Sequence, residues 1–539
     1  MQKIHRRILY SFLTGLFFSI LFYFGTKLLF ATFSDEETCY SILDYILLIP
    51  ITLAATLAFY FLYELKIKLK EDKVFSLKFW HIFIPLVASS IVIFLSIYPG
   101  HYPFDSAKMY EHFEEGSYTT HYSPLVSFVL GIFLSVGKFF GSKELGHAIL
   151  IVLQLIFLNI VITKTILHCS KKLNRKRFGI IFTIFFALHP LVQTLLVRSG
   201  QDTVFGGLFL MLCLEFLKIS EDENYFKDKK KKKFFYIFFL IFFLCATRNN
   251  GIYALIPAVI TSIFILKKET RKRFLIAVIA PVIAFLGYNY LFIYNIVSNR
   301  DSFFLETMNV PVMQIARSMY YNPDEELEEE LKTYFDEDCE TWKMEKWDWG
   351  KYNLSEGISD PYKNCLKTAE IEKDPMKFFS LWQKIGSKNV KNYIEAPAVL
   401  TLGLYHPYLN YEPSWSTFQW HQYVDSYYEN YDLYGINNTS ILPSVRNMMS
   451  VLVYRQGWSR IPVLHLLWGA PFTVHLCLIT LLITFYRRKH KYLLPLFLIF
   501  GLILTVALSP VMLFRYLFPA VIATPILIYI LIRSLSSEK

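Results

Sequence analysis

Apolar blocks of about 20 residues, separated by short basic runs, dominate this chain of 539 residues. A helix of that length crosses the ~30 Å hydrocarbon core of a bilayer. The mean hydropathy is +0.36 and 54% of the residues are hydrophobic, which is unusual for a soluble domain. The N-terminal MQKIHRR precedes an apolar run without a small-residue cleavage site, so we expect an anchor and not a removed signal peptide. The pattern predicts an all-α polytopic membrane protein.

Charge is distributed unevenly along the chain. Acidic stretches lie at 34–38 and 324–330. The basic runs lie in different connections between apolar blocks. Cytoplasmic loops of membrane proteins carry an excess of lysine and arginine, so this alternation predicts the orientation of each block. The net charge of +11 follows from these loops and indicates no nucleic-acid partner. We expect a multi-pass protein of the cell membrane, surrounded by membrane lipid, with both termini cytoplasmic. The basic runs are 66–73, 171–177, 227–233, 267–273 and 487–491.

Under this rule the chain is expected to cross the membrane about 12 times. The segment 123–140 is also apolar, but counting it as a span would place the next basic run outside, so we expect it to lie at the outer surface or to be re-entrant. The short pair 234–247 and 251–266 is expected to form a hairpin with RNNG (248–251) at its outer tip. The expected spans are 8–31, 42–64, 78–98, 145–168, 178–197, 203–219, 234–247, 251–266, 274–296, 464–486, 492–509 and 515–534.

Three domains are expected along the chain. Residues 1–296 form a transmembrane module with an outer loop at 98–123, and residues 464–539 form the C-terminal transmembrane helices. Between them, 297–463 is too long for a connector and is expected to fold as an extracytoplasmic α+β or mostly α domain. Its aromatic part, 411–434, could stack on sugar rings or form tyrosine-rich surface strands. A disulfide between Cys339 and Cys365 is chemically allowed there.

An aspartate follows the third expected span in the stretch IYPGHYPFDSAKMY (97–110). Asp105 is either a functional carboxylate at the membrane surface or an N-cap of an expected helix at 106–116. The sequence contains no P-loop, no GxGxxG and no zinc-ligand spacing, so it offers no ATP-driven or dinucleotide chemistry. His101 and His121 could hold a divalent metal with Asp105, although isolated loop histidines are more often surface residues. No cofactor is therefore assigned.

The layout resembles the GT-C glycosyltransferases, which include protein O-mannosyltransferases and aminoarabinose lipid A transferases. An outward acid follows an early span, surface helices at 106–116 and 125–140 come next, and a large outer segment lies near the C-terminal third. Short fragments are similar to a poorly characterised bacterial branch of that superfamily. A His-Pro turn common in the family is replaced here by Ser123-Pro124. The fragments are YPG…D (98–105), RNNGIY (248–253), NVPVMQIAR (309–317) and RYLFPA (515–520).

The resemblance implies that Asp105 is the catalytic base of an inverting glycosyltransferase. Its donor would be a polyprenyl-phosphate sugar, and its acceptor a hydroxyl of a cell-envelope glycan, lipid or protein. Arg248, Arg317 and Arg515 are each predicted at the outer membrane level, where guanidinium groups suit a phosphate. Each of them could instead extend along the apolar surface to reach the interface. Accessory roles fall to residues expected at the same level, namely His101, Tyr102, His121, Arg198 and Asp202.

Two other functions remain open. A transporter or lipid-linked glycan flippase would need charged residues deep in the spans and a sequence repeat between its halves. The sequence has few charged residues within the expected spans and no such repeat. A polymerase similar to O-antigen ligases would rely on outer-loop arginines and a histidine, without Asp105.

Overall fold

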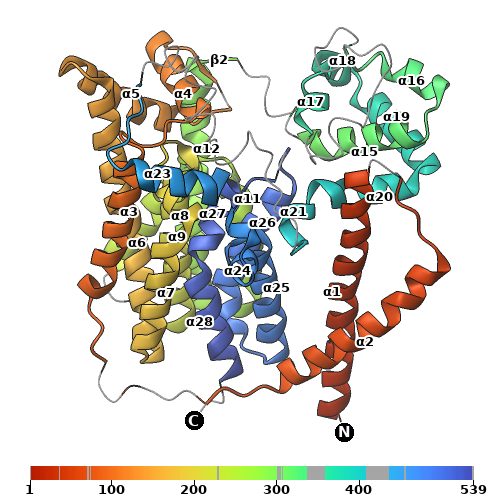
Figure 1. Ribbon diagram of the computed structural model, residues 1–539, viewed down its shortest axis with the longest axis horizontal. Coiled ribbons are helices and arrows are strands. Elements are labelled where there is room, and N and C mark those ends of the chain that lie inside the picture. The colour runs from red at the N-terminus through yellow and green to blue at the C-terminus, as the bar shows by residue number, and fades with distance from the viewer. Residues whose placement is uncertain are drawn as a thin grey trace. The chain divides into compact units, whose positions relative to one another are not determined.

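The protein's structure, a computed structural model, divides into two compact units (Figure 1). The smaller unit comprises Met1–Leu65, Asp301–Pro413 and Val506–Met512, and the larger unit comprises Lys66–Arg300, Ser414–Thr505 and Leu513–Lys539. The division drawn from the sequence follows consecutive segments, whereas these units gather segments that are distant along the chain. The structure describes residues 2–34, 37–68, 72, 75–119, 121–227, 230–299, 305, 307–336, 359–407, 436–454, 457–510 and 512–536.

The larger unit is a bundle of helices. Helices α3, α6, α7, α9 and α28 lie side by side in it (Figure 1). Its first half contains α3 (Phe79–Ser96), α4 (Phe104–Glu115), α5 (Pro124–Phe139), α6 (Lys143–Leu173), α7 (Lys176–Leu188), α8 (Pro190–Leu196), α9 (Gln201–Glu221), α10 (Lys230–Thr247), α11 (Asn250–Ile265), α12 (Lys268–Tyr288), η1 (Asn289–Ile293) and α13 (Tyr294–Ile296). Its second half contains α23 (Pro443–Met449), η4 (Ser450–Tyr454), η5 (Gly457–Arg460), α24 (Leu464–Trp468), α25 (Ala470–Tyr486), η6 (His490–Tyr492), α26 (Leu493–Ala507), α27 (Phe514–Ile522) and α28 (Thr524–Leu535).

Seven helices of the described chain are long and apolar enough to cross a membrane, or nine if each of two bent pairs is one span. The chain is therefore a multi-pass membrane protein. The sequence predicts twelve spans, and that count stays a prediction. Three of the expected spans are not among the nine: α11 and α25, which are shorter apolar helices, and α10, which starts with a run of lysines.

The two bent pairs replace spans that the sequence presents as single blocks. Helices α7 and α8 meet at 73°, and α27 and α28 meet at 48°. Pro190 stands at the start of α8, where a proline cannot continue the preceding helix because it lacks an N–H and crowds the carbonyl one turn back. His189 caps the new helix through an interaction of its ring with the Val192 N–H, at 3.5 Å. The chain thus turns in the middle of an apolar run.

The two helices expected near the outer loop are confirmed with shifted ends. Helix α4 begins after Pro103 and ends at Gly116, a left-handed residue that closes many helices. Helix α5 begins with Ser123 as its N-cap, since the Ser123 hydroxyl accepts the Val126 N–H at 3.2 Å. Ser123-Pro124 thus starts a helix in the way that serine and proline favour. Strand β1 (Tyr118–Thr119) follows α4 and pairs in parallel with β2 (Val297–Asn299), which follows α13.

The smaller unit joins the first two helices to a helical domain. The end of α1 packs against α20 and α21 through Leu28, Val399 and Leu402. The domain encloses its own core, with Val312, Phe335 and Phe378 fully buried. Its described part is helical, which agrees with a mostly α domain. The helices are α1 (Gln2–Ser34), α2 (Ile42–Glu64), α15 (Asn309–Tyr321), α16 (Glu325–Leu331), α17 (Asp360–Lys363), α18 (Thr368–Lys373), α19 (Pro375–Lys388), α20 (Val390–Leu400) and α21 (Leu402–Tyr405).

Two predictions for this region fall outside the described residues. They are the sugar-stacking role of the aromatic segment 411–434 and the pairing of Cys339 with Cys365. Cys365 itself is buried and disulfide-bonded.

Candidate functional site

Two loops of the larger unit are joined by backbone hydrogen bonds at one end of the bundle. The loop after α3 and the loop after α8 meet where the His101 N–H donates to the Val197 carbonyl at 2.8 Å. The Ser199 N–H donates to the His101 carbonyl at 3.0 Å. The Ser199 hydroxyl also donates to the Ser106 hydroxyl at 2.9 Å, inside the first turn of α4. These bonds fix the start of α4 beside the start of α9.

Glycines make this close approach feasible. Gly100 has φ +110°, a conformation that side chains rarely adopt, and a Cβ there would lie 2.7 Å from Ile151. Gly200 has φ +125° immediately before α9. Both positions therefore favour glycine for its conformational freedom, and at Gly100 for its small size as well.

Asp105 is the second residue of α4, and its side chain faces two arginines. Its Oδ2 lies 2.5 Å from Arg515 Nη1 and 3.6 Å from Arg198 Nη2. The N-cap of α4 is Pro103 and not Asp105, so the interpretation of Asp105 as a helix cap is wrong. The carboxylate instead links α4 to α27 and to the loop before α9.

Asp202, in the first turn of α9, extends the same cluster. The Arg248 guanidinium pairs with Asp202, and Arg515 Nε lies 3.5 Å from Asp202 Oδ2. Tyr516 contacts both arginines. Its ring centroid is 4.3 Å from the Arg248 guanidinium carbon and 5.1 Å from that of Arg515, within cation–π range. We call Asp105, Arg198, Asp202, Arg248, Arg515 and Tyr516 the charge cluster.

The charge cluster carries more positive than negative charge. It holds three guanidinium groups against two carboxylates. Asp105 is its most accessible charged side chain, with 27% exposed, against 4% for Arg198 and 12% for Arg515. Burial alone would raise the pKa of Asp105, but the charges of Arg515 and Arg198 outweigh burial and hold the pKa below its ordinary value. The site therefore presents an ionised carboxylate together with cationic capacity for an added anion.

Five of the residues predicted from sequence thus come together within the larger unit, and Arg317 has the surroundings of the other unit. It belongs to the smaller unit, where it is 1% exposed. Its Nη2 lies 2.5 Å from Glu395 Oε2 and donates to the Thr38 hydroxyl at 3.2 Å. This guanidinium is thus enclosed with a carboxylate of its own unit, and the expectation that three arginines share one site stays a prediction.

The predicted accessory residues of the outer loop have different surroundings. His101 is 1% exposed, and burial together with the Arg198 charge lowers its pKa well below the ordinary value. Tyr102 is buried with its ring at 5.1 Å from the His147 ring. His121 contacts Tyr122 and is close enough to Asp105 to help lower that pKa. Within the described ranges, no group of three or more His, Cys, Asp or Glu side chains could hold a metal ion.

Sequence reasoning missed two contributors to the site. Tyr516 stands directly after Arg515 in the RYLFPA fragment, and an aromatic beside a buried arginine is a usable signal for cation–π contact. The Ser106–Ser199 contact had no such signal, because 93 residues separate the partners.

Comparison with other proteins gives a family but no neighbour of known activity. No curated protein and no solved structure matches this chain. The family whose profile matches residues 39–539 is described as a family of unknown function (DUF6020), and the chain belongs to this family.

Proposed function

We propose that this protein is an inverting glycosyltransferase that moves a sugar from a polyprenyl-phosphate donor to an acceptor hydroxyl. The acceptor would be a cell-envelope glycan, lipid or protein at the outer membrane face. The observation that carries the proposal is the position of Asp105, a part-exposed carboxylate held between Arg515 and Arg198 at one end of the bundle. The GT-C resemblance adds that an acid in this loop acts as the base.

The charge cluster offers the two functions that such a transfer needs. As the acceptor oxygen bonds to the anomeric carbon, the bond from that carbon to the phosphate oxygen breaks. The acceptor proton goes to Asp105, and the phosphate leaves with the electron pair. Attack from the side opposite the phosphate inverts the anomeric centre. Arg515 and Arg248 would hold the leaving phosphate, since guanidinium forks match its oxygens.

The place of the arginines suits a phosphate on a lipid tail. Arg248 follows α10, Arg515 stands near the start of α27, and Arg198 follows α8, so each lies at a helix end. The basic runs lie at the other ends of α6 and α9. By the positive-inside rule, we expect the charge cluster at the outer face.

A transporter or lipid-linked glycan flippase is the second candidate, and one observation favours it. Helices α7/α8 and α27/α28 are each broken within an apolar run, and in each pair one helix leads to or carries an arginine of the charge cluster, Arg198 after α8 and Arg515 in α27. Discontinuous helices with polar groups at the break are common in transporter binding sites. In that function, Asp105 would serve as a counter-ion and no glycosidic bond would form.

Transfer assays with matched carboxylate variants separate these functions. Purified protein in nanodiscs is supplied with radiolabelled polyprenyl-phosphate sugars and envelope extract, and release of polyprenyl phosphate is measured. We expect release by the wild type and by Glu111→Gln, which removes an exposed carboxylate of the same helix, but not by Asp105→Asn. Translocation of intact donor without release would favour the flippase. Release that needs Arg515 but not Asp105 would favour a polymerase similar to O-antigen ligases.

A further inference from the structure

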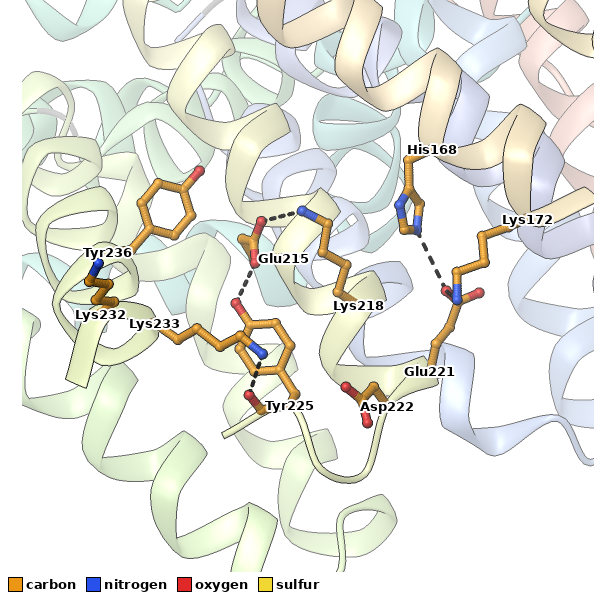
Figure 2. A pocket seen from close by; sticks show the side chains of 10 residues that line it. All are labelled: His168, Lys172, Glu215, Lys218, Glu221, Asp222, Tyr225, Lys232, Lys233 and Tyr236. Carbon is orange, nitrogen blue, oxygen red and sulfur yellow. Dashed lines mark hydrogen bonds and ion pairs between the residues drawn. The ribbon is translucent and has the colours of Figure 1, made fainter. Parts of the chain in front are cut away.

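A cavity of about 440 Å³ opens at the end of α9 remote from the charge cluster. It lies between the C-terminal ends of α6 and α9, the turn at 222–227 and the start of α10 (Figure 2). Helix α9 rises about 1.5 Å per residue, so Asp202 and Glu221 are separated by about 28 Å. The cavity is therefore a separate feature, at the end of the bundle that carries the basic runs.

The carboxylates of this cavity already have partners. Glu215 pairs with Lys218 at 2.6 Å and accepts from the Tyr225 hydroxyl. Figure 2 shows these two contacts from opposite sides of the Glu215 carboxylate. Asp222 accepts the Asn224 N–H at 2.9 Å.

Glu221 has partners of its own. It accepts from the Tyr529 hydroxyl and lies 3.6 Å from His168 and 3.4 Å from Lys172. The acids are thus stabilised without any ligand.

The amines of the cavity are in excess. Four lysines line it, against three carboxylates. Lys232 has no acid within ion-pair distance among the residues that the structure describes, and Lys172 is 48% exposed. Lys233 donates to the Tyr225 carbonyl at 2.7 Å, so it is oriented by a neutral group. Such an arrangement leaves donors and positive charge for an anion.

Three phenylalanines form an apolar ladder on α10, and the first stands between the cavity-lining residues Lys233 and Tyr236 in the sequence. Phe235, Phe239 and Phe243 lie four residues apart on one face of α10, with ring centroids 6.5 and 6.3 Å apart. They are 58%, 52% and 41% exposed. A face of this kind on a helix of a membrane protein suits an acyl chain. A soluble phosphate compound would gain nothing from it.

We propose that the cavity binds the phosphate of an anionic glycerophospholipid, whose acyl chains lie along the phenylalanine ladder of α10. Lys172 and Lys232 contact the phosphate, and Lys233 supports the site from the side of Tyr225. Basic pockets between transmembrane helices bind anionic headgroups by the same combination of charge and depth. A zwitterionic lipid brings a choline cation into the lysine cluster, so it binds less well.

Lipid titration of the full-length protein in detergent tests this site. Native mass spectrometry measures binding of phosphatidylglycerol and of phosphatidylcholine with the same chains. We expect phosphatidylglycerol to bind at least tenfold more tightly. Lys172→Gln with Lys232→Gln should weaken its binding about 25-fold, because each lysine near a membrane surface contributes about fivefold. Equal binding of the two lipids would overturn the proposal.

Two further variants control for folding and for general charge. Lys272→Gln removes an exposed lysine from the basic run 267–273 and should leave affinity unchanged. Asp222→Asn keeps the acceptor for the Asn224 N–H but removes a negative charge from the cavity, so phosphatidylglycerol should bind more tightly. The proposal fails if Lys272→Gln weakens binding as much as the double variant, or if Asp222→Asn weakens it. Glycerol 3-phosphate that binds as tightly as the lipid would instead assign the cavity to a soluble phosphate.

Discussion

Arg317 in the smaller unit and Arg515 in the larger unit each lie 2.5 Å from a carboxylate oxygen, yet their surroundings differ. Arg317 and Glu395 are one positive and one negative charge, with side chains 2% and 5% exposed. Arg515 shares two carboxylates with two other arginines, and its partner Asp105 is 27% exposed. The first pair is closed and balanced, as a structural pair should be. The second is open and carries surplus positive charge, as a binding site for an anion should.

The largest expected effect comes from the open pair. Asp105→Asn keeps the size of the side chain and removes the base, so sugar transfer should fall by about 10²–10⁴. The buried arginines retain Asp202 as a counter-charge, and we expect the protein to remain folded. Turnover is measured in nanodiscs and folding by size-exclusion chromatography. Turnover near wild type would reduce Asp105 to a structural partner of Arg515.

Substitution in the closed pair, Arg317 and Glu395, should lower the stability of the folded protein. Glu395→Gln leaves a buried guanidinium without its carboxylate, which costs about 3–5 kcal/mol. Thermal unfolding should therefore occur at lower temperature, while transfer by the folded protein is unchanged. Replacing both partners, with Arg317→Met and Glu395→Met, should recover most of the loss because no buried charge remains. Loss of sugar transfer in folded Glu395→Gln protein would contradict the contrast between a structural pair at Arg317 and a functional one at Arg515.

Conservative arginine variants compare the pairs directly. Arg515→Lys keeps the charge but loses the bidentate fork, so binding of polyprenyl phosphate should weaken about 10–100-fold. Arg317→Lys should leave that binding unchanged. Fluorescence titration with a labelled polyprenyl phosphate measures both. Weakening by Arg317→Lys as large as by Arg515→Lys would support the sequence-based expectation that Arg317 holds the donor.

A change of pH is expected to have the smallest effect on the rate of sugar transfer. Because the pKa of Asp105 lies below the ordinary ~3.9 of aspartate, its ionised form persists at neutral and mildly acidic pH. Its contribution to stability is present above ~3.9 and is lost as the pH falls through the depressed folded-state value. Transfer rates should thus vary less than about twofold between pH 5 and 8. A fall in the transfer rate as the pH drops through about 6 would show that another group, such as His121, limits the reaction.

Much of this architecture could be predicted from the spacing of apolar and basic residues. Helices α3, α6 and α9 follow long apolar blocks, the charge rule sets 123–140 (α5) apart from the expected spans, and a helix at 106–116 (α4) is expected from the GT-C resemblance. The meeting of Asp105, Asp202 and Arg515 was only partly predictable. A common depth is predicted for them by the expected topology, but depth alone does not bring side chains together.

The remaining features depend on contacts that sequence spacing does not encode. Arg317 shares a predicted depth with Arg248 and Arg515, but it pairs with Glu395, 78 residues further along the chain. The bend at Pro190 had a visible signal, because proline interrupts helices. The cavity beside Tyr225 had none, since it arises from three helix ends and a turn.

Helix α9 gives these observations a mechanical consequence. It is continuous from Gln201 to Glu221 and carries a member of the charge cluster at one end and a wall of the cavity at the other. A rigid lever of about 28 Å that tilts by two degrees moves its far end by about 1 Å. A displacement of that size at a reacting centre can change a rate by about 10²-fold. If the cavity binds lipid and the charge cluster carries out transfer, as proposed above, the lipid composition of one leaflet would adjust the rate of sugar transfer at the opposite leaflet through the tilt of α9.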